Sequence, residues 1–415
     1  GRVLFGIESI GRRSAYLALL TENELALSQL VRLVSASSEI SHWIASHPVI
    51  LDELIDPITA YQPQACSEIC QELARKLDSQ DGEDLEAAME ILREYRQAYS
   101  LRIAAADVAQ LLEIETAGAS LSALAEAVLC HALVIAERTL KTPAAPHESA
   151  ELGIIAYGKL GSQELGYHSD LDIVFVYEQP DAEDPQAAAA RRHYFGRLAQ
   201  RLAHILTTHT PAGEAYSIDT RLRPGGSSGT VVTPIKAYHE YLSTSAWTFE
   251  HQALVRARMI TGSDALRQRF EEIRHRVLCQ PRETSKLQGA MRDMRQRMRQ
   301  HHSRHSGSDF DLKHDAGGIV DIEFLCQYLV LKFAHQTPAL TRHRGNLRIL
   351  SELAASGGIA SETAKTLSDT LAQYLSKENE LKLGRRKALL PETSFAPERE
   401  AIQRLWREQL EHTSS

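Results

Sequence analysis

The stretch that decides the fold is residues 170–176, Asp-Leu-Asp-Ile-Val-Phe-Val, in which two acids open an apolar run. The apolar run predicts a buried strand. Because side chains alternate between the two faces of a strand, Asp170 and Asp172 are expected to point the same way. Two carboxylates that are desolvated side by side repel each other and resist burial. A divalent cation would relieve this repulsion, so the pair predicts a metal site.

A glycine-serine pair lies upstream of the acids. Residues 152–157 form an earlier apolar run, which predicts another buried strand, and Gly161 and Ser162 lie in the connection between the two runs. Glycine lets the backbone approach a phosphate, and the neighbouring hydroxyl can donate a hydrogen bond to it. Gly-Ser pairs are common in turns, so this one points to phosphate chemistry only in combination with the acids that follow.

A third carboxylate follows downstream. Residues 215–222 alternate in a way that predicts a third strand, and a period of two puts Asp219, Arg221 and Arg223 on one face of it. If this strand packs beside the second one, the three acids offer enough oxygen ligands for one or two magnesium ions. Guanidinium groups clamp phosphate oxygens, so the arginines predict a triphosphate site beside the metal. The alternative for both arginines is a structural pairing with the acids.

The predicted secondary structure changes twice along the chain. Residues from about 15 to 140 have helical spacing, the middle mixes short strands with one helix, and the chain is helical again from Thr284. We therefore predict an α+β fold with a helical region at 1–145, a mixed α/β domain at 146–283 and a helical bundle at 284–415.

Composition narrows the class of protein. The 415 residues are 43% apolar, and their net charge of -8 gives no overall attraction to nucleic acid. The five cysteines are an odd number without zinc-type spacing, which favours reduced thiols in a cytoplasmic protein. Glu126 and His131 interrupt the best apolar stretch, so we expect no membrane span. The chain starts at Gly1 without an initiator methionine, and we expect a piece of a longer protein.

Four longer strings carry a resemblance to a known family. The Gly-Ser, Asp-x-Asp and distal Asp pattern is similar to the DNA polymerase β superfamily of nucleotidyltransferases. The strings that resemble glutamine synthetase adenylyltransferases lie at 157–172 (YGKLGSQELGYHSDLD), 219–224 (DTRLRP), 250–258 (EHQALVRAR) and 317–324 (GGIVDIEF). The likeness covers nearly all of the chain. The chain resembles the carboxy-terminal, adenylylating half of a two-part enzyme. Ser162 stands where a second glycine is common, and the spacing from Gly161-Ser162 to Asp170 is slightly shorter than usual.

The resemblance implies a polymerase β-like nucleotidyltransferase domain between amino-terminal helices and a carboxy-terminal helical bundle. It implies transfer of AMP from ATP to a tyrosine hydroxyl of glutamine synthetase, which inactivates that enzyme in the control of nitrogen assimilation. A PII-type signalling protein and glutamine are the implied regulators. The implied roles are metal binding and catalysis, with two Mg²⁺ ions, for Asp170, Asp172 and Asp219, and nucleotide binding for Gly161, Ser162, Lys159, Arg221 and Arg223.

The sequence leaves several alternatives open. The first two are AMP removal by phosphorolysis and another polymerase β-type reaction, such as tRNA tailing or antibiotic modification. A glycosyltransferase using Asp-x-Asp and a non-catalytic scaffold for the PII-type protein are the others. The roles of three further groups of residues stay open. After Trp247 we expect a helix that borders the site and carries Glu250, His251, Arg256 and Arg258. We expect Asp321 and Glu323 on another helix, and a basic, solvated helix face formed by Arg292, Arg295, Arg297 and Arg299.

Overall fold

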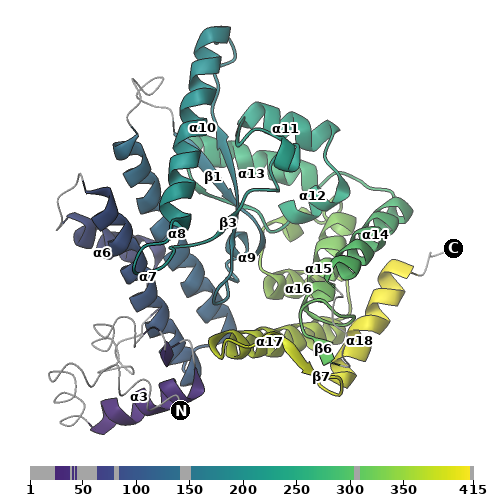
Figure 1. Cartoon of the computed structure of the whole chain (residues 1–415). Helices are drawn as coiled ribbons and strands as arrows, with labels where there is room; N and C mark the ends of the chain where they lie inside the picture. Colours follow the sequence, from purple (N-terminus) through teal and green to yellow (C-terminus); the bar gives the residue numbers. More distant parts are fainter. Residues whose placement is uncertain are drawn as a thin grey trace.

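The structure is a computed structural model of the whole chain. It describes residues 24–37, 40–41, 43, 63–78, 84–140, 151–302 and 309–411. Figure 1 shows long helices beside a small sheet, and a group of helices from the last third of the chain on the other side of it.

The amino-terminal helices agree with the predicted helical texture. They are α3 (Glu24–Ala36), α6 (Cys66–Asp78), α7 (Leu85–Val108) and α8 (Ile114–Thr139). The Asp84 side chain caps α7 by accepting a hydrogen bond from the backbone N–H of Ala87 at 3.0 Å. Arg93 of α7 donates to four backbone carbonyls, those of Met89, Ile205, Thr208 and Gly213. The last three bonds join α7 to the end of the helix at 185–207 and to the segment that leads from it to the third strand.

Helix α8 is long and apolar enough to cross a membrane by length and composition alone. The expectation that Glu126 and His131 break up this apolar stretch is therefore wrong by that measure. In the structure 72% of the apolar window is buried, and α8 packs against α6, α7 and α10. This burial is typical of the core helix of a folded domain.

The sheet has five short strands in the mixed part of the chain (Figure 1). Strand β1 (Leu152–Ala156) pairs antiparallel with β2 (Leu171–Tyr177) and with β5 (Arg258–Thr261). Strand β2 also pairs in parallel with β3 (Ile218–Asp219) and β4 (Val232–Pro234). The two strands predicted at 152–157 and 170–176 are confirmed.

The third predicted strand is much shorter than residues 215–222. It ends at Asp219 because the side chain of that residue accepts a hydrogen bond at 2.8 Å from the backbone N–H of Arg221, which closes a turn. Pro224 follows, and Gly225 and Gly226 have positive φ angles of 77° and 58°, so the chain turns away from the sheet. The prediction that Arg221 and Arg223 share a strand face with Asp219 is wrong.

Two further strands, β4 and β5, were not predicted. We expected Arg256 and Arg258 in one helix with Glu250 and His251, but α12 (Thr248–Leu254) ends before them. Arg258 instead opens β5, which pairs with β1. This pairing with a strand about 100 residues away in sequence decides the local structure, and helical spacing does not reveal it.

Helices cover both faces of the sheet. Along β2, Ile173 and Phe175 lie in a core shared with α6, α7, α8 and α10, whereas Val174 and Val176 lie in a second core shared with the helices that follow β4 in the chain. Burial of both faces explains why β2 is an unbroken apolar run. The remaining helices of this part are α9 (Gly158–Gly161), α10 (Pro185–Thr207), a 3-10 turn (Gly226–Ser228), α11 (Ile235–Thr244) and α13 (Asp264–Leu278).

The carboxy-terminal part is helical, as predicted, apart from a two-stranded ribbon. Its elements are α14 (Thr284–His302), β6 (Asp309–Asp311), α15 (Ile319–Phe333), a 3-10 turn (Pro338–Thr341), α16 (Asn346–Ala355), α17 (Ser361–Leu383), β7 (Leu389–Pro391), α18 (Ala396–Trp406) and a π-helical turn (Arg407–Glu411). The expected solvated arginine face of α14 needs one correction. Arg295 is buried, with its Nε 2.5 Å from Oδ1 of Asp321, because α14 packs against α15.

Candidate active site

The structure brings the acids of β2 and β3 together. Asp172 and Asp219 are paired residues of the parallel ladder between these strands. Asp170 lies just before β2, and its Oδ1 accepts a 2.7 Å hydrogen bond from the hydroxyl of Ser217, just before β3. The same ends are joined by a backbone bond of 3.0 Å from the N–H of Leu171 to the carbonyl of Ser217. Adjacent parallel strands therefore supply all three carboxylates from one end, as the sequence predicts.

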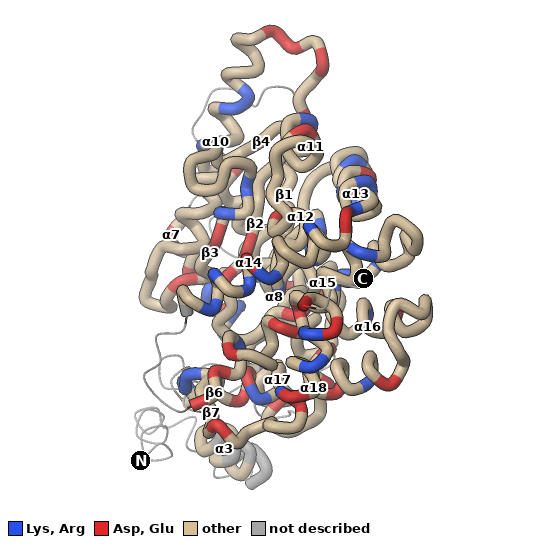
Figure 2. Tube along the Cα trace, turned by 90° about the vertical axis from the view of Figure 1, so that its right-hand side faces the viewer, with Lys and Arg blue, Asp and Glu red and all other residues tan. Residues whose placement is uncertain are grey.

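The electrostatics of the pair are unequal. Burial, followed by the charges of Asp219 and Asp170, raises the pKa of Asp172 from 3.8 to about 6. The pKa of Asp219 is lowered, chiefly by its hydrogen bonds with the Arg221 side chain, whose Nε lies 2.8 Å from Oδ2. The negative charge of the three acids is thus not fully compensated, and Arg221 compensates part of it. Figure 2 shows acidic segments along β2 and β3 with basic segments beside them.

The two arginines do different things. The side chain of Arg221 is 80% exposed and pairs with Asp219. Arg223 instead holds its own loop, because it donates to the carbonyl of Thr220 at 2.9 Å and to the carbonyl of Gly229 at 3.2 Å. The structural pairing considered from the sequence is thus present for Arg221, whereas Arg223 bonds to the backbone.

The predicted phosphate turn is the short helix α9. Gly158 has a φ of +51°, and a Cβ added there would lie 2.3 Å from Oδ2 of Asp172. The backbone N–H of Tyr157 also donates to the carbonyl of Asp172 at 2.8 Å. The glycine that lies against the acids is therefore Gly158, which sequence reasoning did not single out. A Cβ at Gly161 would instead meet the carbonyl oxygens of Arg256 and Ala156, so Gly161 allows close backbone packing.

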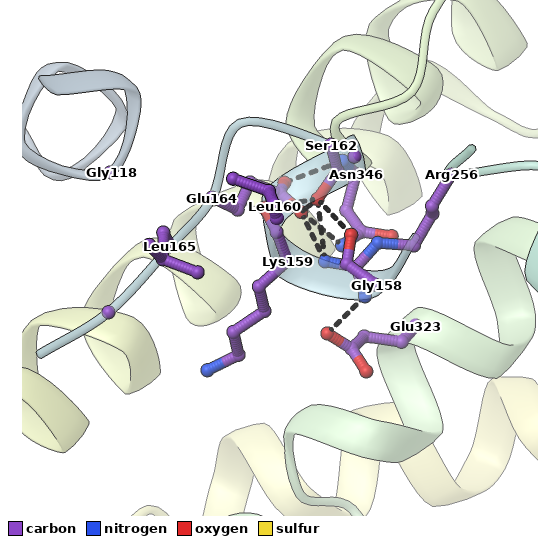
Figure 3. Close-up of polar contacts among 12 residues, drawn as sticks. Gly118, Gly158, Lys159, Leu160, Ser162, Glu164, Leu165, Arg256, Glu323 and Asn346 are labelled. Carbon is purple, nitrogen blue, oxygen red and sulfur yellow. Dashed lines mark hydrogen bonds and ion pairs between the residues drawn. The ribbon is translucent and has the colours of Figure 1, made fainter. Parts of the chain in front are cut away.

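The other two predicted nucleotide contacts already have partners in the chain. Lys159 Nζ lies 2.7 Å from Oε2 of Glu378 on α17. Ser162 is buried, and its hydroxyl oxygen lies 3.0 Å from the carbonyl oxygen of Gly158 and 2.9 Å from Oε2 of Glu164, either of which can accept its proton. Figure 3 shows Ser162 turned toward Glu164 and Arg256, with the Lys159 side chain extending away from them.

Sequence reasoning missed a buried charged cluster behind this turn. Arg256 donates to Ser162, to Glu164 and to Glu323 of α15 (Figure 3). All four residues belong to the strings that carried the family resemblance, which was the available signal. Their contact depends on tertiary packing and does not follow from their spacing.

Among the described residues, no group of three or more His, Cys, Asp or Glu side chains is placed to hold a metal ion. The three acids are neighbours, but in this arrangement their carboxylate oxygens do not point at one position, as the predicted metal site requires. The physical reason is that Asp219 turns toward Arg221, and Asp170 accepts the hydroxyl of Ser217. The guanidinium of Arg221 is the cation that compensates Asp219 in this arrangement.

Comparison with known proteins identifies the family. A family model described as glutamate-ammonia ligase adenylyltransferase matches residues 27–273, which is more than half of the chain. The chain belongs to this family. A second model, described as GlnD PII-uridylyltransferase, matches residues 289–405.

Three relatives in this family are each named bifunctional glutamine synthetase adenylyltransferase/adenylyl-removing enzyme. The relative from Nitrosococcus oceani is 42% identical over 100% of this chain, and that from Thioalkalivibrio sulfidiphilus is 40% identical over 99%. The relative from Vibrio parahaemolyticus is 41% identical over 98%. The chain spans only 43% to 44% of the length of these relatives.

Proposed function

We propose that this chain transfers AMP from ATP to a tyrosine hydroxyl of glutamine synthetase and thereby inactivates that enzyme. The observation that carries the proposal is the pairing of Asp172 with Asp219, next to Asp170, in a chain of the glutamate-ammonia ligase adenylyltransferase family. The relatives' printed name supports the choice of substrate.

The chemistry needs a base and charge compensation. The tyrosine oxygen would attack the α-phosphorus of ATP while the bond from that phosphorus to the bridging oxygen breaks, and pyrophosphate would leave with the electron pair. A tyrosine has an ordinary pKa near 10, so its proton must be accepted as the new bond forms. Asp219 would accept this proton or align the hydroxyl, and its hydrogen bonds with Arg221, which lower the pKa of its carboxyl group, keep it ionised at neutral pH.

The three acids are the ligand type that a hard cation prefers, and their side chains would turn from Ser217 and Arg221 to meet at one ion. Asp170, Asp172 and Asp219 offer only carboxylate oxygens, which Mg²⁺ prefers, and Arg221 already shows that a positive charge is favourable beside them. One or two Mg²⁺ ions would be held by these three residues. When bound, magnesium would neutralise phosphate charge and lower the pKa of the attacking hydroxyl. Arg221 would then be released toward the phosphates of the nucleotide.

Nucleotide binding is proposed for the α9 turn and its neighbours. Gly161 and Ser162 shape the turn beside the acids, and Lys159 and Arg221 would supply positive charge to the leaving pyrophosphate. Arg223 would act by holding the loop that follows Asp219, as its bonds to the carbonyls of Thr220 and Gly229 suggest.

We propose a polymerase β-like fold for the central domain. The support is a small mixed sheet in which an Asp-x-Asp strand lies beside the strand that bears the third acid. We also propose domains at 1–145, 146–283 and 284–415. The break between the two family matches, after residue 273 and before residue 289, supports the second boundary.

The AMP-removing activity is the second candidate, because the relatives' name includes both directions. We favour addition, with a PII-type protein and glutamine as regulators. The likeness of residues 289–405 to a PII-uridylyltransferase model is compatible with a link to PII.

Incubation with labelled ATP and unmodified glutamine synthetase tests whether the chain adds or removes AMP. Label on glutamine synthetase supports addition, whereas label released from premodified glutamine synthetase only in the presence of phosphate supports removal.

A further inference from the structure

The buried charged cluster behind α9 joins three parts of the chain. Arg256, between α12 and β5, is only 4% exposed. Its Nη2 lies 2.8 Å from both the Ser162 hydroxyl and Oε2 of Glu164, and its Nη1 lies 2.7 Å from Oε1 of Glu323. A guanidinium group that is removed from water in this way requires such partners, so its position is closely determined.

Glu164 is the residue where the cluster meets the turn. Its Oε2 accepts hydrogen bonds from Ser162 at 2.9 Å and from Arg256, while its Oε1 accepts the backbone N–H of Asn346 at 2.7 Å. The Asn346 side chain adds a bond of 3.0 Å from Nδ2. Asn346 is the first residue of α16, so this carboxylate also satisfies the amino end of that helix.

Two helices of the carboxy-terminal part therefore contact the α9 turn through this cluster, on the side away from the acids. Helix α15 does so through Glu323 and Arg256, and α16 does so through Asn346 and Glu164, as Figure 3 shows. On its other side the turn touches the acids, through the bond from Tyr157 N–H to the Asp172 carbonyl and the close approach of Gly158 to the Asp172 carboxylate. A displacement of α15 or α16 would thus be transmitted across one short helix to Asp172.

We propose that Glu164, Arg256 and Glu323 are positioning residues, through which the carboxy-terminal helices set the place of the α9 turn relative to Asp172. The inference rests on the proposed adenylyl transfer. The three side chains act through Ser162 and the turn backbone and do not touch the reacting atoms. The pKa of Glu164 is raised because its burial outweighs the lowering effect of Arg256, so the contacts with Arg256, Ser162 and Asn346 offset only part of the cost of burying this carboxylate.

The test compares two changes on one helix, Glu323→Ala and Asp321→Asn. Asp321 also lies on α15 and is bonded to Arg295 and Arg299, but it has no bond to the turn. Residues two apart on a helix point to different sides, so the second change breaks a buried ion pair while leaving the cluster intact. Arg299→Gln removes only the ion pair of Arg299 with Asp321 and keeps that of Arg295. It replaces Asp321→Asn as the control if that variant does not fold.

The kinetic readout is the transfer of AMP from ATP to glutamine synthetase. A misplaced reacting group costs rate more than ground-state binding, so Glu323→Ala should lower kcat by about tenfold or more and change KM for ATP by less than about threefold. Glu323→Gln keeps an oxygen that can accept from Arg256 and should restore kcat to within about threefold of the wild type. Asp321→Asn should lower Tm with kcat nearly unchanged below its unfolding transition.

Hydrogen exchange gives a readout that does not need activity. The amides of Gly161, Ser162 and Glu164 are bonded to the carbonyls of Tyr157, Gly158 and Lys159 in the turn. Their exchange should become about tenfold faster in Glu323→Ala and stay unchanged in Asp321→Asn. Equal effects of the two changes on kcat and exchange, or no effect of Glu323→Ala on either, would overturn the proposal. Faster exchange in a chain whose wild type adds no AMP would support the positioning contact and contradict the proposed function.

Discussion

Asp172 and Asp219 are paired across two parallel strands, and within the described part of the chain only Asp219 of the two forms an ion pair with a basic side chain. Arg221 bonds to Asp219, while Asp172 faces the close approach of Gly158 and the carboxylates around it. The pKa of Asp172 is raised to about 6 and that of Asp219 is lowered. The two neighbouring acids therefore differ in how strongly they hold a proton.

The first prediction concerns stability without metal. The folded pKa of Asp172, about 6, lies above the ordinary value of 3.8, so the folded state binds this proton more tightly than the unfolded state. Stability therefore falls as pH rises between these values, and the full cost, about 2–3 kcal/mol, is present above the folded pKa. Asp172→Asn should raise Tm relative to the wild type at about pH 8 in the presence of chelator, and by less at about pH 5. An equal Tm difference at both pH values would contradict this.

The second prediction concerns magnesium. If the acids hold Mg²⁺, adding it without ATP should raise the Tm of the wild type by a few degrees, because the ion binds only the folded state. The double change Asp170→Asn with Asp172→Asn removes two of the three carboxylates and should abolish the rise. Sodium chloride at the same ionic strength controls for screening. A rise of the same size in the double variant would exclude these residues as the site.

The third prediction tests the role of Gly158. An alanine there would have to adopt a φ of +51° and place its Cβ 2.3 Å from the Asp172 carboxylate. Gly158→Ala should cost about 1–3 kcal/mol of folding stability and lower adenylyl transfer by about a hundredfold. The matched control is Gly289→Ala within α14, where a Cβ meets nothing within 4 Å. The control should gain about 0.5–1 kcal/mol in chemical denaturation and keep full activity. Similar losses in both variants would count against a specific contact with Asp172.

The fourth prediction separates the two arginines. Arg221 forms an exposed ion pair, so Arg221→Ala should change the free energy of unfolding by less than about 1 kcal/mol while raising KM for ATP. Arg223→Ala leaves the carbonyls of Thr220 and Gly229 without their donor and should cost about 1–3 kcal/mol. Chemical denaturation and steady-state kinetics measure both effects. The opposite order of stability losses would show that the loop does not depend on Arg223.

The core of the site follows from local rules. Two apolar runs and the period of a strand were enough to place β1, β2 and the acids at the start of β2, and the pairing of Asp172 with Asp219 followed from packing a third strand beside the second. These inferences depend on alternation along single strands. The length of β3 did not follow, because the Asp219 side chain bonds to the Arg221 backbone and ends the strand.

Other features depend on distant partners. Strand β5 looks helical in sequence, and only its pairing with β1 makes Arg258 a strand residue. Arg295 looks like one of several surface arginines, yet α15 supplies Asp321 and buries both. The cluster of Glu164, Arg256 and Glu323 joins residues from three separate motifs. Long-range packing of this kind leaves no periodic signal within one segment.

The most direct test of the central claim is mass spectrometry of intact glutamine synthetase after incubation with this chain, ATP and Mg²⁺. The account predicts that modified subunits gain the mass of one AMP on a tyrosine, and that Asp172→Asn and Asp219→Asn abolish the gain while remaining folded. No added mass with the folded wild-type chain, or undiminished addition by both variants, would contradict it.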